Sequence, residues 1–437
     1  MKDKAFVFAI MKNKQLLIII VIPIVTAILC VVIYLLPAVN QRIVWRMANL
    51  RTQIHYFLNP PDRLVFDPSS QAGSESNIVL PTILPTTTRL SDPSPTSANE
   101  TSQPIPTPTL IATQVPIPLE VTIGGVPHEY QSFNNCGPAN LSMVLRFWGW
   151  QGDQRIIRDT LRSNENDANV MPDELAGFVE SHSELKALVR IGGTLPLLKQ
   201  FVAAGFPVII ESGHQPADDW WMGHYVTISG YDDQQAIFIT QDSLIMPNLP
   251  LPYNELKHNG WRDFNNLYLL IYPPDREQDV QSILNHDLDP VQNVVNSLAN
   301  TSQEFLTVTQ RAYFFALYNQ GSDQLALGDP FSAAESFDQA FAFYQTLKDE
   351  IRPWRVLWYR VEPYEAYYKV GRYQAVIDLA NTTLSMLNKR GLEESHYWRG
   401  MAYQALGNKE KAIFDFDIAI QLRADYTLAL EALDRLR

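Results

Sequence analysis

One cysteine lies in a segment whose residue types suit nucleophilic chemistry. Cys136 belongs to the run Gln-Ser-Phe-Asn-Asn-Cys-Gly-Pro-Ala-Asn at residues 131–140, and the only other cysteine, Cys30, lies in an apolar segment. We therefore expect Cys136 to carry a free thiol. Pro138 suits the first turn of a helix, and apolar residues follow with helical spacing over 141–148. The positive end of that helix would favour the thiolate, the nucleophilic form of the side chain.

A proton acceptor and an orienting group for this thiol lie much later in the chain. His224 lies in Gly-His-Tyr-Val-Thr-Ile-Ser-Gly-Tyr at residues 223–231, and Asp242 closes Ala-Ile-Phe-Ile-Thr-Gln-Asp at residues 236–242. Both runs are typical of strands, and the polar turn at 232–235 predicts an antiparallel hairpin. Equal distances from the turn would make the two side chains cross-strand neighbours, with Cβ atoms about 5 Å apart. A shifted register would still leave both at the same end of the hairpin.

In this order and spacing the residues resemble the bacteriocin-processing peptidases and their stand-alone relatives, which are papain-like cysteine peptidases. The resemblance covers roughly residues 118–275. It implies an α+β papain-like fold and acyl-enzyme chemistry. The site residues that it implies are the nucleophile Cys136, the general base His224, the orienting residue Asp242 and the oxyanion donor Gln131.

Taken singly, these residues have simpler interpretations, and only their joint occurrence favours a peptidase-like site. A lone cysteine is usually a small buried hydrophobe, and a lone strand histidine is usually structural. His128, His182 and His214 match no part of the pattern, and we interpret them as structural. Gln-Asp-Ser at 241–243 departs from the Asp-Pro of many relatives, so the exit from that strand can differ. The spacing of His and Cys predicts no metal site, and the chemistry requires no cofactor.

The N-terminal part predicts a membrane anchor on a spacer. A short tail, residues 1–14, precedes an almost wholly apolar segment, residues 15–39, which exceeds the about 20 residues that span a bilayer. We interpret this segment as an uncleaved transmembrane helix, with the tail in the cytoplasm and the rest of the chain outside. The juxtamembrane residues 40–66 carry a helical apolar stripe. Residues 67–120, rich in Pro, Thr and Ser, predict a disordered linker.

Residues 121–275, the peptidase-like domain, predict helices followed by a sheet. Beyond the Cys136 helix, we expect helices at 154–161, 172–181 and 195–204, and strands at 207–212 and 267–272. A nucleophile on an early helix, with base and orienter on a later sheet, is the order of α+β papain-like folds.

Residues 276–437 predict an all-α, tetratricopeptide-like solenoid. Gly400, Tyr403, Gly407, Ala412, Phe416 and Ala419 match the small and aromatic positions of that repeat. The turn glycines Gly328, Gly371 and Gly407 are separated by 43 and 36 residues, so an insertion near 346–354 makes the middle copy irregular. Such a solenoid commonly binds a peptide or a partner protein. A purely structural helical bundle is the alternative.

Together, these features predict a membrane-anchored, outward-facing cysteine peptidase that hydrolyses peptide bonds. Its repeat domain would recruit a peptide or protein substrate, or a protein partner. Two alternatives stay open: a non-catalytic adaptor that binds peptide, and an acyltransferase or amidase that uses the same thiol. The formal charge of -13 argues against a nucleic-acid partner, because phosphate binding needs clustered Lys and Arg.

Overall fold

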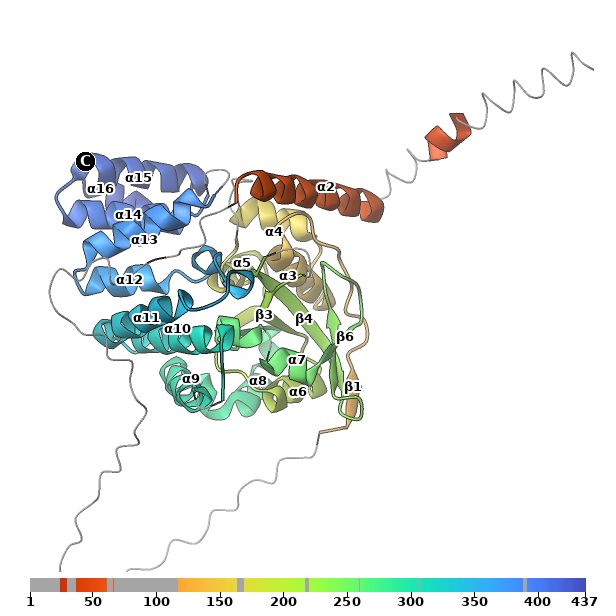
Figure 1. The fold of residues 1–437 in the computed structure, drawn as a ribbon. Helices are drawn as coiled ribbons and strands as arrows, with labels where there is room; N and C mark the ends of the chain where they lie inside the picture. Colours follow the sequence, from red (N-terminus) through yellow and green to blue (C-terminus); the bar gives the residue numbers. More distant parts are fainter. Residues whose placement is uncertain are drawn as a thin grey trace, which may run out of the picture.

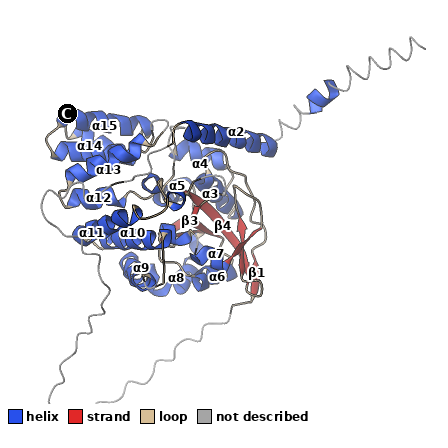
Figure 2. Ribbon diagram, in the orientation of Figure 1, coloured by secondary structure: helices blue, strands red, loops and turns tan. Residues whose placement is uncertain are grey.

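The computed structural model describes residues 24–29, 37–60, 66, 117–162, 169–216, 220–258, 260–305, 307–387 and 391–437. Figures 1 and 2 show a sheet with helices on both sides, and a stack of helices beside it that runs to the C-terminus. The predicted α+β centre and the all-α C-terminal region are thus both observed. The boundaries drawn between them remain predictions.

The sheet has seven strands, and every neighbouring pair is antiparallel. Its order is β2-β7-β3-β4-β5-β6, with β1 paired to β4. The strands are β1 Glu120–Thr122, β2 Lys186–Arg190, β3 Val208–His214, β4 Met222–Asp232, β5 Ile237–Gln241, β6 Leu249–Pro252 and β7 Tyr268–Tyr272. β4 lies inside the sheet, and all but the first of its residues are buried. The predicted strands are confirmed, whereas β1, β2 and β6 were not predicted.

Alternating side chains of the central strands enter two different cores. Ile209 of β3 packs with Leu141 and the other apolar residues of the Cys136 helix, whereas its neighbours Val208 and Ile210 pack on the opposite face. This alternation follows from the two-residue period of a strand. The first core is covered by α3 Cys136–Phe147, α4 Gln154–Leu161 and α5 Pro172–His182, and the second mainly by α6 Leu195–Ala203 and α8 Glu277–Leu284. The helices predicted in this region are therefore confirmed.

The C-terminal region is built of helix pairs, as predicted. α10 Arg311–Ala326 packs on α11 Pro330–Tyr344, α12 Glu362–Lys369 on α13 Tyr373–Ser385, and α14 Glu393–Ala405 on α15 Lys409–Leu422. α9 Pro290–Glu304 precedes these pairs and α16 Thr427–Asp434 follows them. The turn glycines Gly328, Gly371 and Gly407 have φ values of 83°, 77° and 77°, a conformation that favours glycine. The expected insertion lies between α11 and α12.

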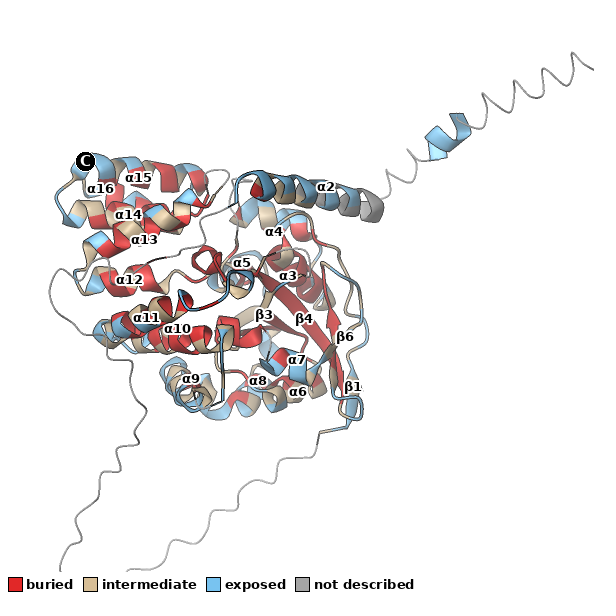
Figure 3. Cartoon of the chain, viewed as in Figure 1, coloured by how far each residue is buried: buried red, intermediate tan, exposed pale blue. Residues whose placement is uncertain are grey.

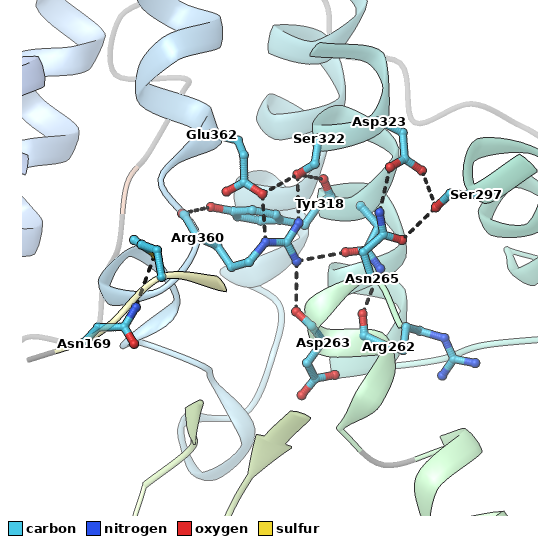
Figure 4. Close-up of polar contacts among 12 residues, drawn as sticks. Asn169, Arg262, Asp263, Asn265, Ser297, Tyr318, Ser322, Asp323, Arg360 and Glu362 are labelled. Carbon is cyan, nitrogen blue, oxygen red and sulfur yellow. Dashed lines mark hydrogen bonds and ion pairs between the residues drawn. The ribbon is translucent and has the colours of Figure 1, made fainter. Parts of the chain in front are cut away.

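That insertion brings the repeat region against the sheet. Arg360, which follows the insertion's last 3-10 turn, Val356–Trp358, is 7% exposed and donates hydrogen bonds to groups of both regions. Figure 4 shows its guanidinium between Asp263 on one side and the α10 side chains on the other. Asn265 reaches Asp323 of α10 in the same junction, at 2.6 Å between Asn265 Nδ2 and Asp323 Oδ1.

The segments predicted at the N-terminus fall largely outside the described residues. The predicted tail 1–14 lies wholly outside them, and the span 15–39 and the linker 67–120 mostly do. In the described part of the chain, no helix has the length and apolar character needed to cross a membrane. The juxtamembrane segment does form a helix, α2 Pro37–Leu58, whose Tyr56 packs edge-on against Trp354 of the insertion at 5.5 Å between ring centroids.

Candidate active site

Cys136 is the first residue of α3, as the sequence predicts. The side chain of the preceding Asn135 makes no capping hydrogen bond to the helix, and its amide Nδ2 donates to Gln154 Oε1 at 2.7 Å. Gln154, fully buried, also accepts from the backbone N–H of Ser132 and so holds the loop that leads to Cys136. Gly137 permits close packing, since a Cβ there would make a tight contact of 3.3 Å with the ring of Tyr225.

His224 and Asp242 form a buried hydrogen bond, with 3.0 Å between His224 Nε2 and Asp242 Oδ1. The same carboxylate oxygen accepts from the backbone N–H groups of Leu244 at 2.8 Å and Ile245 at 3.0 Å, which fix its position. The same imidazole ring interacts with the Cys136 thiol, and this interaction shifts the pKa of both groups. Because Asp242 occupies Nε2, Nδ1 is the ring nitrogen that can exchange a proton with the thiol.

The register predicted for this hairpin was wrong, although the two side chains do meet. Thr227 pairs with Gln241. A bulge between Ile228 and Gly230 changes the register, so that the pairs nearer the turn are offset from those farther from it. Asp242 therefore lies just beyond the end of β5 and does not pair with His224 across the strands. The hydrogen bond forms because the chain turns after Gln241 and brings the carboxylate to the imidazole.

Cys136 and His224 change each other's proton affinity. Burial raises the pKa of Cys136, but the hydrogen bond and charge of His224 lower it more, so that the net pKa lies below the ordinary value. Burial likewise lowers the pKa of His224, but Asp242 and Cys136 raise it more, so that the net pKa lies above its ordinary value. The arrangement thus favours a thiolate beside an imidazolium.

Gln131 lies next to this pair through the segment that follows Asp242. Its backbone N–H donates to the carbonyl oxygen of Ser243 at 2.9 Å, and its side-chain Oε1 accepts from the Ser243 hydroxyl at 2.8 Å. The side chain is buried. Ser243 is the residue that departs from the Asp-Pro of many relatives, and its hydroxyl now has a partner. The structure therefore brings all four predicted site residues, directly or through Ser243, into one region at the start of β4 and the end of β5.

Sequence reasoning missed two residues beside the site. The ring centroid of His214 lies 5.5 Å from that of His224, and burial, followed by the charge of His224, lowers the pKa of His214 to about 4. His214 follows Ser212, the partner of His224 in the register, by two residues, so strand alternation could have placed it there. Tyr359 of the insertion packs on Gly223, where a Cβ would lie 2.8 Å from its ring. No local signal indicated that contact.

The other two histidines interpreted as structural do pack on aromatic rings. His182 stacks on Phe178 with 4.4 Å between ring centroids, and His128 meets Tyr130 edge-on at 4.5 Å. Among the described residues, no group of three or more His, Cys, Asp and Glu could hold a metal ion.

Comparisons with known proteins find two similar regions. Residues 123–267 match the model of the Peptidase_C39 like family, and residues 393–426 match the tetratricopeptide repeat. A solved structure of a C39-like peptidase from Bacillus anthracis is 18% identical, with a TM-score of 0.30, over 35% of this chain and 96% of that chain. The curated proteins contain no match. The chain thus joins a region similar to the C39-like peptidases to a C-terminal region similar to tetratricopeptide repeats.

Proposed function

We propose that this protein is a cysteine peptidase that cleaves peptide bonds with Cys136 as nucleophile and His224 as general base. The observation that carries the proposal is the buried His224–Asp242 hydrogen bond of 3.0 Å, on an imidazole ring that also interacts with the Cys136 thiol at a helix N-terminus. A structural histidine would not need a carboxylate on one side and a thiol on the other. The lowered pKa of Cys136 supports the same conclusion.

In the proposed reaction, the Cys136 thiolate attacks the carbonyl carbon of the scissile peptide bond. The resulting oxyanion accepts hydrogen bonds from Gln131 Nε2 and from the backbone N–H of Cys136. The C–N bond then breaks as His224 gives its proton to the leaving amine, while Asp242 holds the imidazole in place. Water, losing a proton to His224, hydrolyses the thioester and restores the free thiol. Transfer to an amine would share the acyl-enzyme and differ only in the acceptor.

The same proposal includes membrane attachment through the N-terminal segment. The apolar stripe of α2 is exposed at Ile43, Met47, Leu50, Ile54 and Leu58. Figure 3 shows the helix mainly in the colour of exposed residues. The exposed Arg46 and Arg51 lie on α2, which contains no acidic residue, and the buried Tyr56 faces the protein. An apolar stripe with basic residues and no acidic ones suits a lipid surface.

Anionic vesicles should therefore bind the wild type better than Met47→Asp/Ile54→Asp, and equal binding would contradict this attachment.

We further propose that the repeat region recruits a peptide substrate or protein partner, as such arrays commonly do. The matched repeat at residues 393–426 and the helix pairs α10 to α15 support this role. Pull-down of a synthetic peptide library on the full chain, with Cys136→Ala to prevent turnover, would identify ligands. If every captured peptide is displaced by peptides that bind at Cys136, no ligand binds the repeats, and a separate role for them is contradicted.

The decisive test is the pH dependence of iodoacetamide alkylation of Cys136. It uses the full chain with Cys30→Ala, so that one thiol remains, beside the same chain with His224→Ala. We expect the parent thiol to react with an apparent pKa well below the ordinary cysteine value of about 8.5, and the variant to react with an ordinary pH profile. Identical, ordinary profiles in both proteins would contradict the peptidase proposal and favour the non-catalytic, peptide-binding adaptor.

A further inference from the structure

Asn140, the fully buried fifth residue of α3, has an amide whose orientation is fixed by its neighbours. Its Nδ2 lies 2.9 Å from the carbonyl oxygen of Cys136 and 2.7 Å from that of Tyr225. Carbonyl oxygens only accept, so the nitrogen of the amide must face them. Its Oδ1 accepts the hydroxyl of Thr227 at 2.8 Å. The exchanged orientation would bring oxygen against two carbonyl oxygens and is therefore excluded.

The fixed amide of Asn140 determines the direction in which Ser243 donates. Asn140 Nδ2 lies 3.1 Å from Ser243 Oγ, and an amide N–H₂ group cannot accept a hydrogen bond. The hydroxyl proton of Ser243 must therefore point elsewhere. Gln131 Oε1, at 2.8 Å, is the acceptor that receives it. Ser243 is 1% exposed, so water does not compete for this proton.

The direction of the Ser243 bond in turn orients Gln131. Because its Oε1 accepts from Ser243, the other branch of the amide, Nε2, is the one directed away from Ser243. Nε2 is a donor, the type of group that an oxyanion needs. In the opposite orientation, the carbonyl oxygen of Gln131 would face the oxyanion and repel it.

We propose that Asn140 and Ser243 are positioning residues that hold Gln131 with its N–H₂ group toward the oxyanion. The inference rests on the peptidase activity proposed above and goes beyond it, because it says which hydrogen bonds fix the orientation of the Gln131 amide. Thr227 donates to Asn140, the N–H₂ group of Asn140 faces Ser243 Oγ, and Ser243 donates to Gln131. Asn140 also donates to the carbonyl oxygens of Cys136 and of Tyr225, the neighbour of His224. Together with its contact to Ser243, this one side chain therefore connects the segments that carry the thiol, the imidazole and the partner of Gln131.

Two small probes separate orientation of the oxyanion site from reactivity of the thiol. Acylation by p-nitrophenyl acetate joins Sγ to the carbonyl carbon, passes through an oxyanion and releases p-nitrophenolate. Alkylation by iodoacetamide joins Sγ to a CH₂ carbon, releases iodide and forms no oxyanion. The ratio of the two rate constants therefore reports the oxyanion site alone. The parent for all variants is the full chain with Cys30→Ala.

We expect Ser243→Ala to lower the acylation rate constant roughly tenfold, as loss of one orienting hydrogen bond implies, with the pH profile of alkylation unchanged. Ser243→Thr keeps the hydroxyl and should retain most of the acylation rate. Gln131→Ala should lower acylation at least as much, and adding Ser243→Ala to it should cause little further loss, because Ser243 acts through Gln131. Ser229→Ala removes another buried hydroxyl from the same hairpin and should leave the ratio unchanged.

Three results would overturn the inference. Acylation that is unchanged in Ser243→Ala, acylation and alkylation that fall in parallel, or losses that add fully in the double variant would each show that Ser243 does not act through Gln131. Failure of the proposed function has a different signature: the parent itself would show an ordinary alkylation profile, with no difference from His224→Ala.

Discussion

The active site and the junction with the repeats are both buried polar networks, but they differ in how completely their donors are used. At the junction, Arg360 Nε donates to Glu362, Nη1 to the carbonyl oxygen of Asp263 and to Asn319, and Nη2 to Ser322. All three of its nitrogens are engaged within the protein (Figure 4). In the proposed site, by contrast, the thiol and the amide Nε2 of Gln131 would serve an incoming group. The four donated bonds of Arg360 hold two regions together, whereas the donors of the proposed site would bind a substrate.

The two networks also obtain their charges differently. The guanidinium of Arg360 is always charged. Burial lowers its pKa, but the charge of Glu362 opposes this effect, and the net pKa of Arg360 is raised. At the site, both charges arise when the proton of Cys136 moves to His224, and they vanish when it returns. Permanent charge suits a fixed contact, and transferable charge suits chemistry. Variants in each network should therefore affect different measurements.

The largest expected effect is on turnover, from His224→Ala. Loss of the general base and of the imidazolium that stabilises the thiolate should lower kcat/KM by roughly 10³-fold or more. The variant should also lose the lowered pKa of Cys136, which alkylation measures. Its unfolding midpoint in urea should change little by comparison. If kcat/KM stays within tenfold of wild type, His224 is not the base.

Arg360→Met should produce the reverse pattern. Removing the cation leaves buried acceptors of the junction unpaired, at a cost of roughly 3–5 kcal/mol in the free energy of unfolding. Alkylation of Cys136 in the folded fraction should keep its pH profile. Arg372→Met is the control, since Arg372 forms a half-exposed ion pair with Asp338 at 2.7 Å and should cost only about 1 kcal/mol. Equal destabilisation by the two variants would contradict a special role for the junction.

Asp242→Asn should have an intermediate effect. The amide keeps the size of the side chain but loses the charge that raises the pKa of His224. We expect kcat/KM to fall by roughly 10²-fold and alkylation to be slowed less than in His224→Ala. The basic limb of the pH–rate profile should also move to lower pH, because His224 then loses its proton more easily. Equal alkylation rates in the two variants would count against the orienting role.

Short sequence patterns predicted those parts of the site whose structure depends on residues close together in the chain. Pro138 and the apolar spacing after it predicted the helix that begins at Cys136, and the polar turn predicted the β4–β5 hairpin. The register was wrong mainly because the turn lies between Asp232 and Ile237, at residues 233–236, and not at 232–235. The bulge at Ser229 adds an offset that depends on how β4 fits its neighbours in the sheet, which no short pattern encodes. Asn140 was visible in the motif, but its partners Tyr225 and Ser243 lie 85 and 103 residues away. Its role therefore required the fold.

The junction was less accessible to sequence reasoning than the site. The irregular spacing of the turn glycines predicted an insertion, and the insertion is present between α11 and α12. What the insertion contacts could not be predicted, because Arg360 and Tyr359 carry no motif and reach residues about 100 to 140 positions earlier. Catalytic chemistry restricts residue types and spacing, and so leaves a pattern. Domain docking requires only complementary surfaces, which many residue types can supply.

The smallest expected effect, on pH dependence, also separates the two networks. Burial raises the pKa of Asp323 to about 7, although hydrogen bonds from Ser297 and Asn265 oppose the change. The folded protein therefore holds a proton that the unfolded chain has lost above its ordinary pKa of 3.8. As a result, this group should lower the free energy of unfolding as pH rises from about 4 to about 7. Asp323→Asn cannot titrate, so its urea midpoint should decline less across that window than that of the wild type. Because Asp323 lies at the junction, alkylation of Cys136 should respond to pH alike in both proteins. Parallel stability curves would mean that Asp323 stays charged in the folded protein, held by its two donors as firmly as Arg360 is held by its acceptors.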